Sequence, residues 1–208
     1  MTDLDAARES LVDRLATRGF DDAVLTALRA VPRHAFVPTD QRRLAYEDRP
    51  LPIGNNQTIS APHMVAIMAD ELGVDPGDRV LEVGTGCGYH AAVTAELVGS
   101  ENVYSVEVDE DLAARARETL GATGYDDVAV RVGDGREGWP EHGPYDAAYL
   151  TCAAPEIPSA ILDQVRDGGT VLAPVGRRRQ ELVRVTVDGD DHRREQLGGV
   201  RFVRLRGG

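Results

Sequence analysis

The chain has 208 residues, of which 42% are hydrophobic, so it can bury one substantial core but is too short for two separate ones. Its formal net charge of -12 disfavours a nucleic-acid partner, because phosphate binding depends on clustered positive charge. Since it shows neither a basic start followed by an apolar core nor an apolar run of membrane-spanning length, we expect a cytoplasmic protein without a membrane partner.

Side chains that bind metals or form disulfides are few. The two cysteines, Cys87 and Cys152, cannot supply a disulfide scaffold or a cysteine zinc site, and we expect two unpaired thiols. The five histidines show no ligand spacing. The sequence therefore predicts no metal site.

The N-terminal region predicts helices followed by an irregular segment. Apolar residues from Leu4 to Leu15 recur with helical spacing, and Gly19 offers an end to that helix. A second helix is predicted over 23–30. Four prolines within 31–52 discourage regular structure, so this segment is expected to lie extended over the core.

Ser60 is a candidate both for capping a helix and for chemistry. It precedes Ala61 and Pro62, which predicts that Ser60 is the N-cap of a helix whose apolar residues, from Met64 to Leu72, face the core. A capping hydroxyl can still donate its own proton to a bound carboxylate, assisted by the positive end of the helix.

The segment 79–89, RVLEVGTGCGY, is an apolar run that ends in a glycine-rich turn. Its glycines, Gly84, Gly86 and Gly88, follow G-x-G-x-G and not the dinucleotide pattern G-x-G-x-x-G. Glu107 ends the next apolar run, where it can accept hydrogen bonds from ribose hydroxyls. This arrangement resembles the first two motifs of S-adenosylmethionine-dependent methyltransferases.

From residue 78 onward, strand and helix patterns alternate, which predicts a parallel sheet with helices on both faces. The predicted strands are 80–83, 103–108, 128–132, 147–151 and 170–174, and the predicted helices are 90–98, 111–123 and 158–165. The last segments, 181–187 and 196–205, predict an antiparallel hairpin.

These elements resemble the α/β Rossmann-like methyltransferase fold, with a mostly parallel sheet and a C-terminal antiparallel hairpin. We expect a single domain over 1–208, in which 1–77 holds the N-terminal helices and a substrate-facing segment and 78–208 holds the cofactor-binding sheet. Asp134 follows the strand at 128–132, so the ends of three strands, at Gly84, Glu107 and Asp134, are expected to converge on one crevice.

Eight short segments together resemble the protein-L-isoaspartate O-methyltransferase family over nearly the whole chain and in the family's order. They are VPRHAFVP at 31–38, AYED at 45–48, PIG at 52–54, QTIS at 57–60, the turn at Gly84, GDG at 133–135, AAP at 153–155 and PVG at 174–176. The first and the QTIS segment are the most distinctive, because other methyltransferases share the glycine turn and not these two.

The resemblance implies roles for particular residues. Ser60 matches the family's active-site serine, and the implied substrate-facing residues are Gln57, Thr58, Ile59 and His63. The implied cofactor-binding residues are Glu82, Gly84, Thr85, Gly86, Glu107, Asp134, Gly135 and Gln180. The chain departs from the family at Cys152, where alanine is more usual, and at the arginines 177–179, which replace a more neutral turn.

The resemblance also implies a reaction. A methyl group passes from S-adenosylmethionine to the free carboxylate of an L-isoaspartyl residue in a damaged protein, and the ester then closes to a succinimide. The α-carboxyl pKa is ~3.5, so this acceptor is already ionised at neutral pH and needs no general base. Catalysis is then a matter of positioning and of excluding water, a task that suits the hydroxyl of Ser60. We expect a monomer that acts on isoaspartyl proteins and peptides.

Three other functions remain open. The enzyme could methylate another protein group or a small molecule, and isoaspartyl and aspartyl peptides would separate these substrates. A nicotinamide-dependent oxidoreductase is disfavoured by the glycine spacing and by the absence of a Tyr-Lys pair in a chain without lysine. A regulatory module would bind the cofactor without transferring a methyl group.

Overall fold

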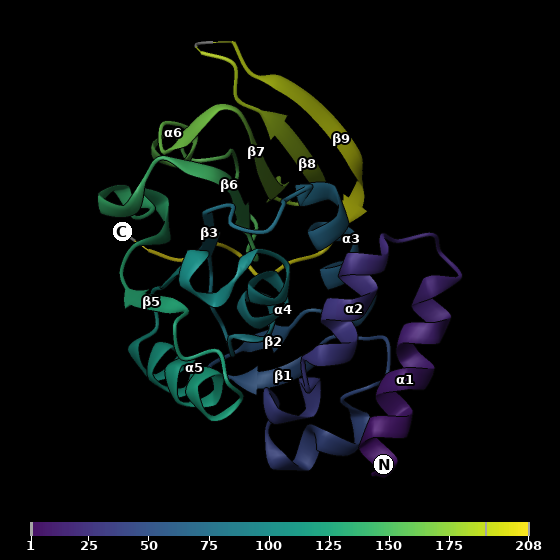
Figure 1. The fold of residues 1–208 in the computed structure, drawn as a ribbon. Coiled ribbons are helices and arrows are strands. Elements are labelled where there is room, and N and C mark those ends of the chain that lie inside the picture. The colour runs from purple at the N-terminus through teal and green to yellow at the C-terminus, as the bar shows by residue number, and fades with distance from the viewer. Residues whose placement is uncertain (1, 190, 208) are drawn as a thin grey trace.

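The computed structural model describes residues 2–189 and 191–207, and its centre is a seven-stranded sheet in the order β5-β4-β3-β6-β7-β8-β9 (Figure 1). The first five strands in that order pair parallel, and β8 and β9 pair antiparallel at one edge. In the same order the strands span Ala129–Val132, Val103–Glu107, Val80–Val83, Tyr145–Leu150, Val165–Val175, Gln180–Thr186 and Arg193–Val200. The predicted mostly parallel sheet with a C-terminal hairpin is confirmed.

Within these residues, six α-helices and several short 3-10 turns surround the sheet. The helices are α1 (Asp3–Ala16), α2 (Asp22–Ala30), α3 (Pro62–Leu72), α4 (Tyr89–Val98), α5 (Glu110–Ala122) and α6 (Ser159–Leu162). The 3-10 turns are η1 (Arg33–Ala35), η2 (Thr39–Leu44), η3 (Ser100–Asn102), η4 (Gly135–Glu137) and η5 (Pro140–His142). No helix in the described part of the chain has the length and apolarity to cross a bilayer.

Both faces of the sheet are buried, as the near-continuous apolar strands predict. Alternate residues of β6 enter different clusters: Ala147 and Tyr149 pack with α1 to α5, whereas Ala148 and Leu150 pack with α6 and the C-terminal segment. This period-2 alternation places helices on either side of the strands.

A small hairpin lies outside the main sheet and was not predicted. It pairs β1 (Leu51–Gly54) with β2 (Gln57–Ile59), and Asn55 and Asn56 between them have φ angles of 51° and 56°. Two left-handed residues are what a tight two-residue hairpin turn requires, and asparagine tolerates them better than most residues. The segment 31–52, predicted as extended, instead contains η1 and η2 before reaching this hairpin.

Two predictions near the C-terminus are wrong in extent. The helix predicted over 158–165 is only the single turn α6, because Val165 pairs with Tyr145 and begins β7. The strand predicted over 196–205 ends at Val200, since the Gln180 amide binds both backbone groups of Phe202 and turns the chain out of the sheet. Residues 201–207 then cross the carboxyl ends of the strands, as the yellow trace in Figure 1 shows.

The strand order fixes where a ligand can enter. Strand β3 lies between β4 and β6. The chain runs outward from β3 through β4 to β5 and then crosses back to β6 on the other side of β3, so the strand order reverses between β3 and β6. In open α/β sheets this reversal leaves a crevice at the carboxyl ends of the strands. The turn at Gly84 follows β3 and Thr151 follows β6, so both line this crevice.

Candidate active site

The glycine turn between β3 and α4 forms the floor of the crevice. Gly84, Gly86 and Gly88 have φ angles of 99°, 56° and 88°, a region that disfavours side chains. A Cβ at Gly84 would also overlap the hydroxyl of Thr151, which donates to the Gly84 carbonyl at 2.5 Å. The backbone at this turn is therefore fixed and open toward a ligand.

Glu107, at the end of β4, holds the turn from its other side. One carboxylate oxygen accepts from the Gly86 N–H at 2.8 Å, and the other accepts from the Asp109 N–H at 3.1 Å. Asp109 in turn caps α5 and accepts from the Asn55 amide at 2.8 Å. The β1–β2 hairpin is thus joined to the cofactor-side strands through one carboxylate.

Beneath the turn lies a buried polar network. Tyr149 donates to Glu82 at 2.9 Å, and Ser105 bonds both to Glu82 and, at 2.6 Å, to Thr85. Burial raises the pKa of Glu82 to about 8, more than the hydroxyl donors lower it. A carboxyl group protonated at neutral pH therefore supports the turn from inside the protein.

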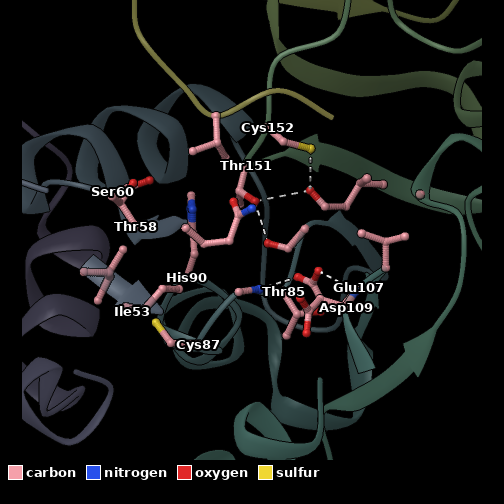
Figure 2. Close-up of a pocket in the computed structure, with 18 of the residues that line it drawn as sticks. Ile53, Thr58, Ser60, Thr85, Cys87, His90, Glu107, Asp109, Thr151 and Cys152 are labelled. Atoms are coloured by element: carbon pink, nitrogen blue, oxygen red, sulfur yellow. Dashed lines mark hydrogen bonds between the residues drawn. The ribbon is translucent and has the colours of Figure 1, made fainter. Parts of the chain in front are cut away.

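The crevice holds a cavity with about 800 Å³ of empty space, part of it open to solvent, which we call the main cavity (Figure 2). Figure 2 shows Thr58 and Ser60 on one side of it and Glu107 on the other. Nine of the predicted site residues line it: Gln57, Thr58, Ile59, Ser60, Gly84, Thr85, Gly86, Glu107 and Gly135. The sequence-based grouping of the β2 loop with the glycine turn therefore matches a single cavity.

Four predicted site residues lie outside the lining of this cavity. Glu82 is under the turn, and Asp134 is engaged with Arg136 at 2.5 Å. Gln180 binds the Phe202 backbone, and His63 bonds through Nδ1 to Asp48 at 2.8 Å. A role for these four is one of support or of contact at the periphery.

The expectation that Ser60 caps α3 is wrong. The N-cap is Ala61, without a side-chain bond, because Pro62 occupies the first helical position and keeps the preceding residue extended. No hydrogen bond among the described residues involves the Ser60 hydroxyl, while its carbonyl accepts from the buried Arg33 at 3.0 Å. The hydroxyl is left available to a ligand.

His90 is a lining residue that the sequence analysis did not assign. Its ring is 7% exposed and lies 4.5 Å from the ring of Tyr149, and Nδ1 has no partner among the described residues. Burial lowers the pKa of His90 to about 3, so the imidazole is neutral at physiological pH. Its position directly after the glycine turn was the available signal.

The C-terminal segment also escaped prediction as part of the site. Val203, Arg204, Leu205 and Arg206 line the main cavity, and Arg206 donates to the Asn55 carbonyl at 3.3 Å. The local sequence of this segment is typical of a strand. Its actual path depends on contacts with Ala153 and Gln180, which are distant in the sequence.

The two cysteines are free thiols, as expected. Burial raises the pKa of Cys87 to about 11 and that of Cys152 to about 12, so neither forms a thiolate near neutral pH. Neither side chain is suited to nucleophilic chemistry.

Comparison with known proteins gives one consistent family. The family model described as protein-L-isoaspartate(D-aspartate) O-methyltransferase matches residues 6–208. A protein-L-isoaspartate O-methyltransferase from Archaeoglobus fulgidus is 52% identical over 208 residues, covering 99% of this chain and 95% of the relative. One from Methanopyrus kandleri is 51% identical, covering 97% and 92%.

Solved structures agree with this result. A protein-L-isoaspartate O-methyltransferase structure superposes with a TM-score of 0.89 at 30% identity, covering 96% of this chain and 66% of the other. A β-aspartate methyltransferase structure from Plasmodium falciparum, in complex with S-adenosyl-L-homocysteine, gives 0.83 at 26% identity and covers 96% and 98%. These two proteins share the fold described above over almost the whole of this chain.

Proposed function

Because the chain belongs to the protein-L-isoaspartate(D-aspartate) O-methyltransferase family, we propose that Ser60 holds the acceptor carboxylate at the edge of the main cavity. The protein transfers a methyl group from S-adenosylmethionine to the free carboxylate of L-isoaspartyl residues, which initiates repair of damaged proteins through a succinimide. What remains to be assigned is how its own residues do this.

The main cavity fits S-adenosylmethionine. It lies at the carboxyl ends of the parallel strands, where such sheets bind their ligands, and its floor is an exposed backbone turn. We assign ribose binding to Glu107 and close backbone approach to Gly84 and Gly86. Val108, one of the few exposed large apolar side chains among the described residues, offers an apolar surface beside them. When bound, the cofactor supplies a methyl group activated by a positively charged sulfur.

One observation carries the proposed role of Ser60. It lines both the main cavity and a second cavity that opens beside it, so its hydroxyl lies where cofactor and polypeptide would meet. An isoaspartyl carboxylate is ionised at neutral pH, so it needs a hydrogen-bond donor and not a base. Gln57, Thr58 and Ile59 form the adjoining wall, against which a bound polypeptide would exclude water from that point.

The four predicted site residues that do not line the main cavity have other roles. Gln180 fixes the C-terminal segment, and Glu82 supports the glycine turn. Asp134 remains a predicted cofactor contact, although its carboxylate is held by Arg136, and His63 remains a predicted substrate contact in the second cavity. The division at residue 77, the monomeric state and the cytoplasmic location also remain predictions.

Replacing the hydroxyl tests the role of Ser60. We expect Ser60→Ala to lower kcat for an isoaspartyl peptide roughly 10- to 100-fold, because a hydrogen bond to a charged group is lost, while cofactor affinity changes less than about 2-fold. Label transfer from methyl-labelled cofactor to an isoaspartyl peptide and to its aspartyl twin measures the first, and calorimetry measures the second.

Ser159→Ala is the matched control, since Ser159 is exposed at the start of α6 and lines neither cavity. Weakened cofactor binding with normal turnover of the bound complex would contradict the role assigned to Ser60. Equal labelling of both peptides by the wild-type protein would contradict the substrate.

A further inference from the structure

Beside the main cavity lies an open groove of about 2030 Å³. The two share Thr58, Ser60, Thr151, Val203 and Arg204 in their walls, so the groove opens directly onto the proposed acceptor position. A polypeptide that presents a carboxylate to Ser60 must continue in one direction along this groove, because the main cavity is occupied by cofactor.

The groove has an unusual charge for this protein. Among its described lining residues, five arginines stand against a single acidic residue, Glu181, although the whole chain carries a net charge of -12. We call it the arginine groove, after Arg177, Arg178, Arg179, Arg201 and Arg204. Within residues 2–189 and 191–207 none of these five guanidinium groups forms an ion pair. Their charge is available to a ligand.

The arginines come from two segments that are held together. Arg177 to Arg179 form the turn between β7 and β8, and Arg201 and Arg204 belong to the C-terminal segment. The Arg204 guanidinium donates to the Arg177 carbonyl at 3.3 Å, which links the segments directly.

Further bonds fix the C-terminal segment itself. The Phe202 N–H donates to the Gln180 amide oxygen at 2.6 Å, and the Gln180 amide nitrogen donates to the Phe202 carbonyl at 3.1 Å. On the opposite side the Ala153 N–H donates to the Val203 carbonyl at 2.7 Å, and the Leu205 N–H donates to the Ala153 carbonyl at 2.8 Å. The backbone that carries the charges is therefore preorganised along the groove.

We propose that the arginine groove binds the residues that flank the isoaspartyl site and selects substrates in which those residues are acidic. This inference rests on the proposed function. An extended chain advances about 3.3 Å per residue, so the side chains one to three positions from the acceptor lie within reach of the groove wall. Carboxylates there meet a local positive potential, whereas lysines meet repulsion.

The groove suits a short acidic peptide better than a nucleic acid. Phe202 is the single Phe, Tyr or Trp among its described lining residues, and it offers little stacking surface for successive bases. A long polyanion would also extend over the acidic remainder of the surface. The positive region is local and ends at the catalytic position, which is where peptide selection is needed.

Three isoaspartyl peptides test the proposal. They differ only in the two residues nearest the isoaspartyl residue, which are Glu, Gln or Lys. At low salt we expect kcat/KM to fall in the order Glu, Gln, Lys, by roughly 3- to 10-fold at each step, and to converge as salt screens the charges.

A pair of charge-matched variants locates the effect. Arg178→Gln with Arg179→Gln is expected to reduce the ratio between the Glu and Gln peptides to about 2 or less. Arg193→Gln with Arg194→Gln removes the same charge from β9, outside the groove lining, and should leave the ratio unchanged.

Several results would overturn the inference. Equal kcat/KM for all three peptides at low salt would do so, as would a preference that survives in the Arg178/Arg179 variant or disappears equally in the Arg193/Arg194 control. Stronger inhibition by a single-stranded RNA than by a polyglutamate of equal charge would assign the groove to nucleic acid. In each of these cases methylation of the Gln peptide above its aspartyl twin would leave the proposed function intact, and loss of that difference would refute the function itself.

Discussion

The main cavity and the arginine groove meet at Ser60 but are lined by different kinds of groups. The floor of the main cavity is backbone, shaped by left-handed glycines and supported by a buried network at Glu82. The arginine groove carries exposed, charged side chains on the β7–β8 turn and on the C-terminal segment. This difference suits the two ligands. The cofactor is always the same molecule, whereas the sequence around a damaged residue differs from one substrate to the next.

This contrast predicts that the main cavity and the arginine groove respond to different kinds of change. A ligand of constant shape is best held by rigid backbone geometry, so the main cavity should be sensitive to steric change and to the protonation of its support. A variable ligand is better held by long, adaptable side chains, so the groove should respond to salt and to charge. Substitutions in each region test whether the two regions respond separately.

The largest effect is expected from Gly84→Ala. The new Cβ would require a disfavoured φ of 99° and would overlap the Thr151 hydroxyl, which together cost about 3 kcal/mol. Cofactor affinity should therefore fall roughly 100-fold, as measured by calorimetry, with little change in the preference among flanking sequences.

Gly77→Ala is the matched control for strain alone. Gly77 has a φ of 94°, and no heavy atom lies within 4 Å of the place where a Cβ would stand, so it shares the backbone penalty without the overlap. Equal losses of cofactor affinity in the two variants would show that global destabilisation, and not the shape of the turn, is responsible.

An effect of similar size, on stability instead of cofactor affinity, is expected where the two regions share a support. Arg33 is fully buried, lies 5.7 Å from the Tyr89 ring centroid, and donates to the carbonyls of Ser60, Arg49 and Ala45. Arg33→Met leaves these carbonyls unpaired and should lower the free energy of unfolding by about 3 kcal/mol, as measured by urea denaturation.

Arg33 should also act as a positioning residue. Because its Nη2 fixes the Ser60 carbonyl, the variant should lose kcat more than cofactor affinity even at temperatures where it is fully folded. Arg33→Lys, which retains a donor, should recover part of the loss. A variant that is unstable but has normal kcat when folded would reduce Arg33 to a purely structural role.

The sequence predicted the fold on the cofactor side of the crevice better than the fold on the substrate side, for a physical reason. Gly84, Glu107 and Gly135 lie at strand ends, and a parallel sheet brings such ends to one edge whatever the loops do. The alternation of strand and helix patterns placed β3 to β6, α4 and α5 within about two residues of their observed bounds.

Elements fixed by contacts between distant residues were harder to predict. The path of the C-terminal segment depends on Gln180 and Ala153, which lie more than twenty residues before it. The β1–β2 hairpin did have a local signal, the pair Asn55 and Asn56 between apolar residues, and the prolines around it hid that signal. Pro62 similarly moved the helix cap from Ser60 to Ala61.

The smallest effect concerns the support of the main cavity and appears as a dependence of stability on pH. Folding raises the pKa of Glu82 to about 8 from an unfolded value of ~4.3, so the folded protein keeps a proton that the unfolded chain releases. This contribution is fully present below the unfolded pKa and is lost as pH rises to 8. His90, whose pKa is lowered to about 3, opposes this trend below pH ~6.5.

Between pH ~6.5 and 8 the Glu82 contribution should therefore dominate, at about 1.4 kcal/mol per pH unit, or about 3 to 6 °C in Tm. Glu82→Gln keeps an acceptor for Tyr149, and its amide nitrogen can donate to the Ser105 hydroxyl once that hydroxyl turns its proton toward Thr85. Because Gln cannot titrate, the Tm of this variant should fall less steeply over this range. Glu118→Gln, at an exposed position on α5, is the control. Parallel Tm curves for the wild type and Glu82→Gln would mean that Glu82 is ionised in the folded protein, and the main cavity would then rest on a buried charge and not on a neutral network.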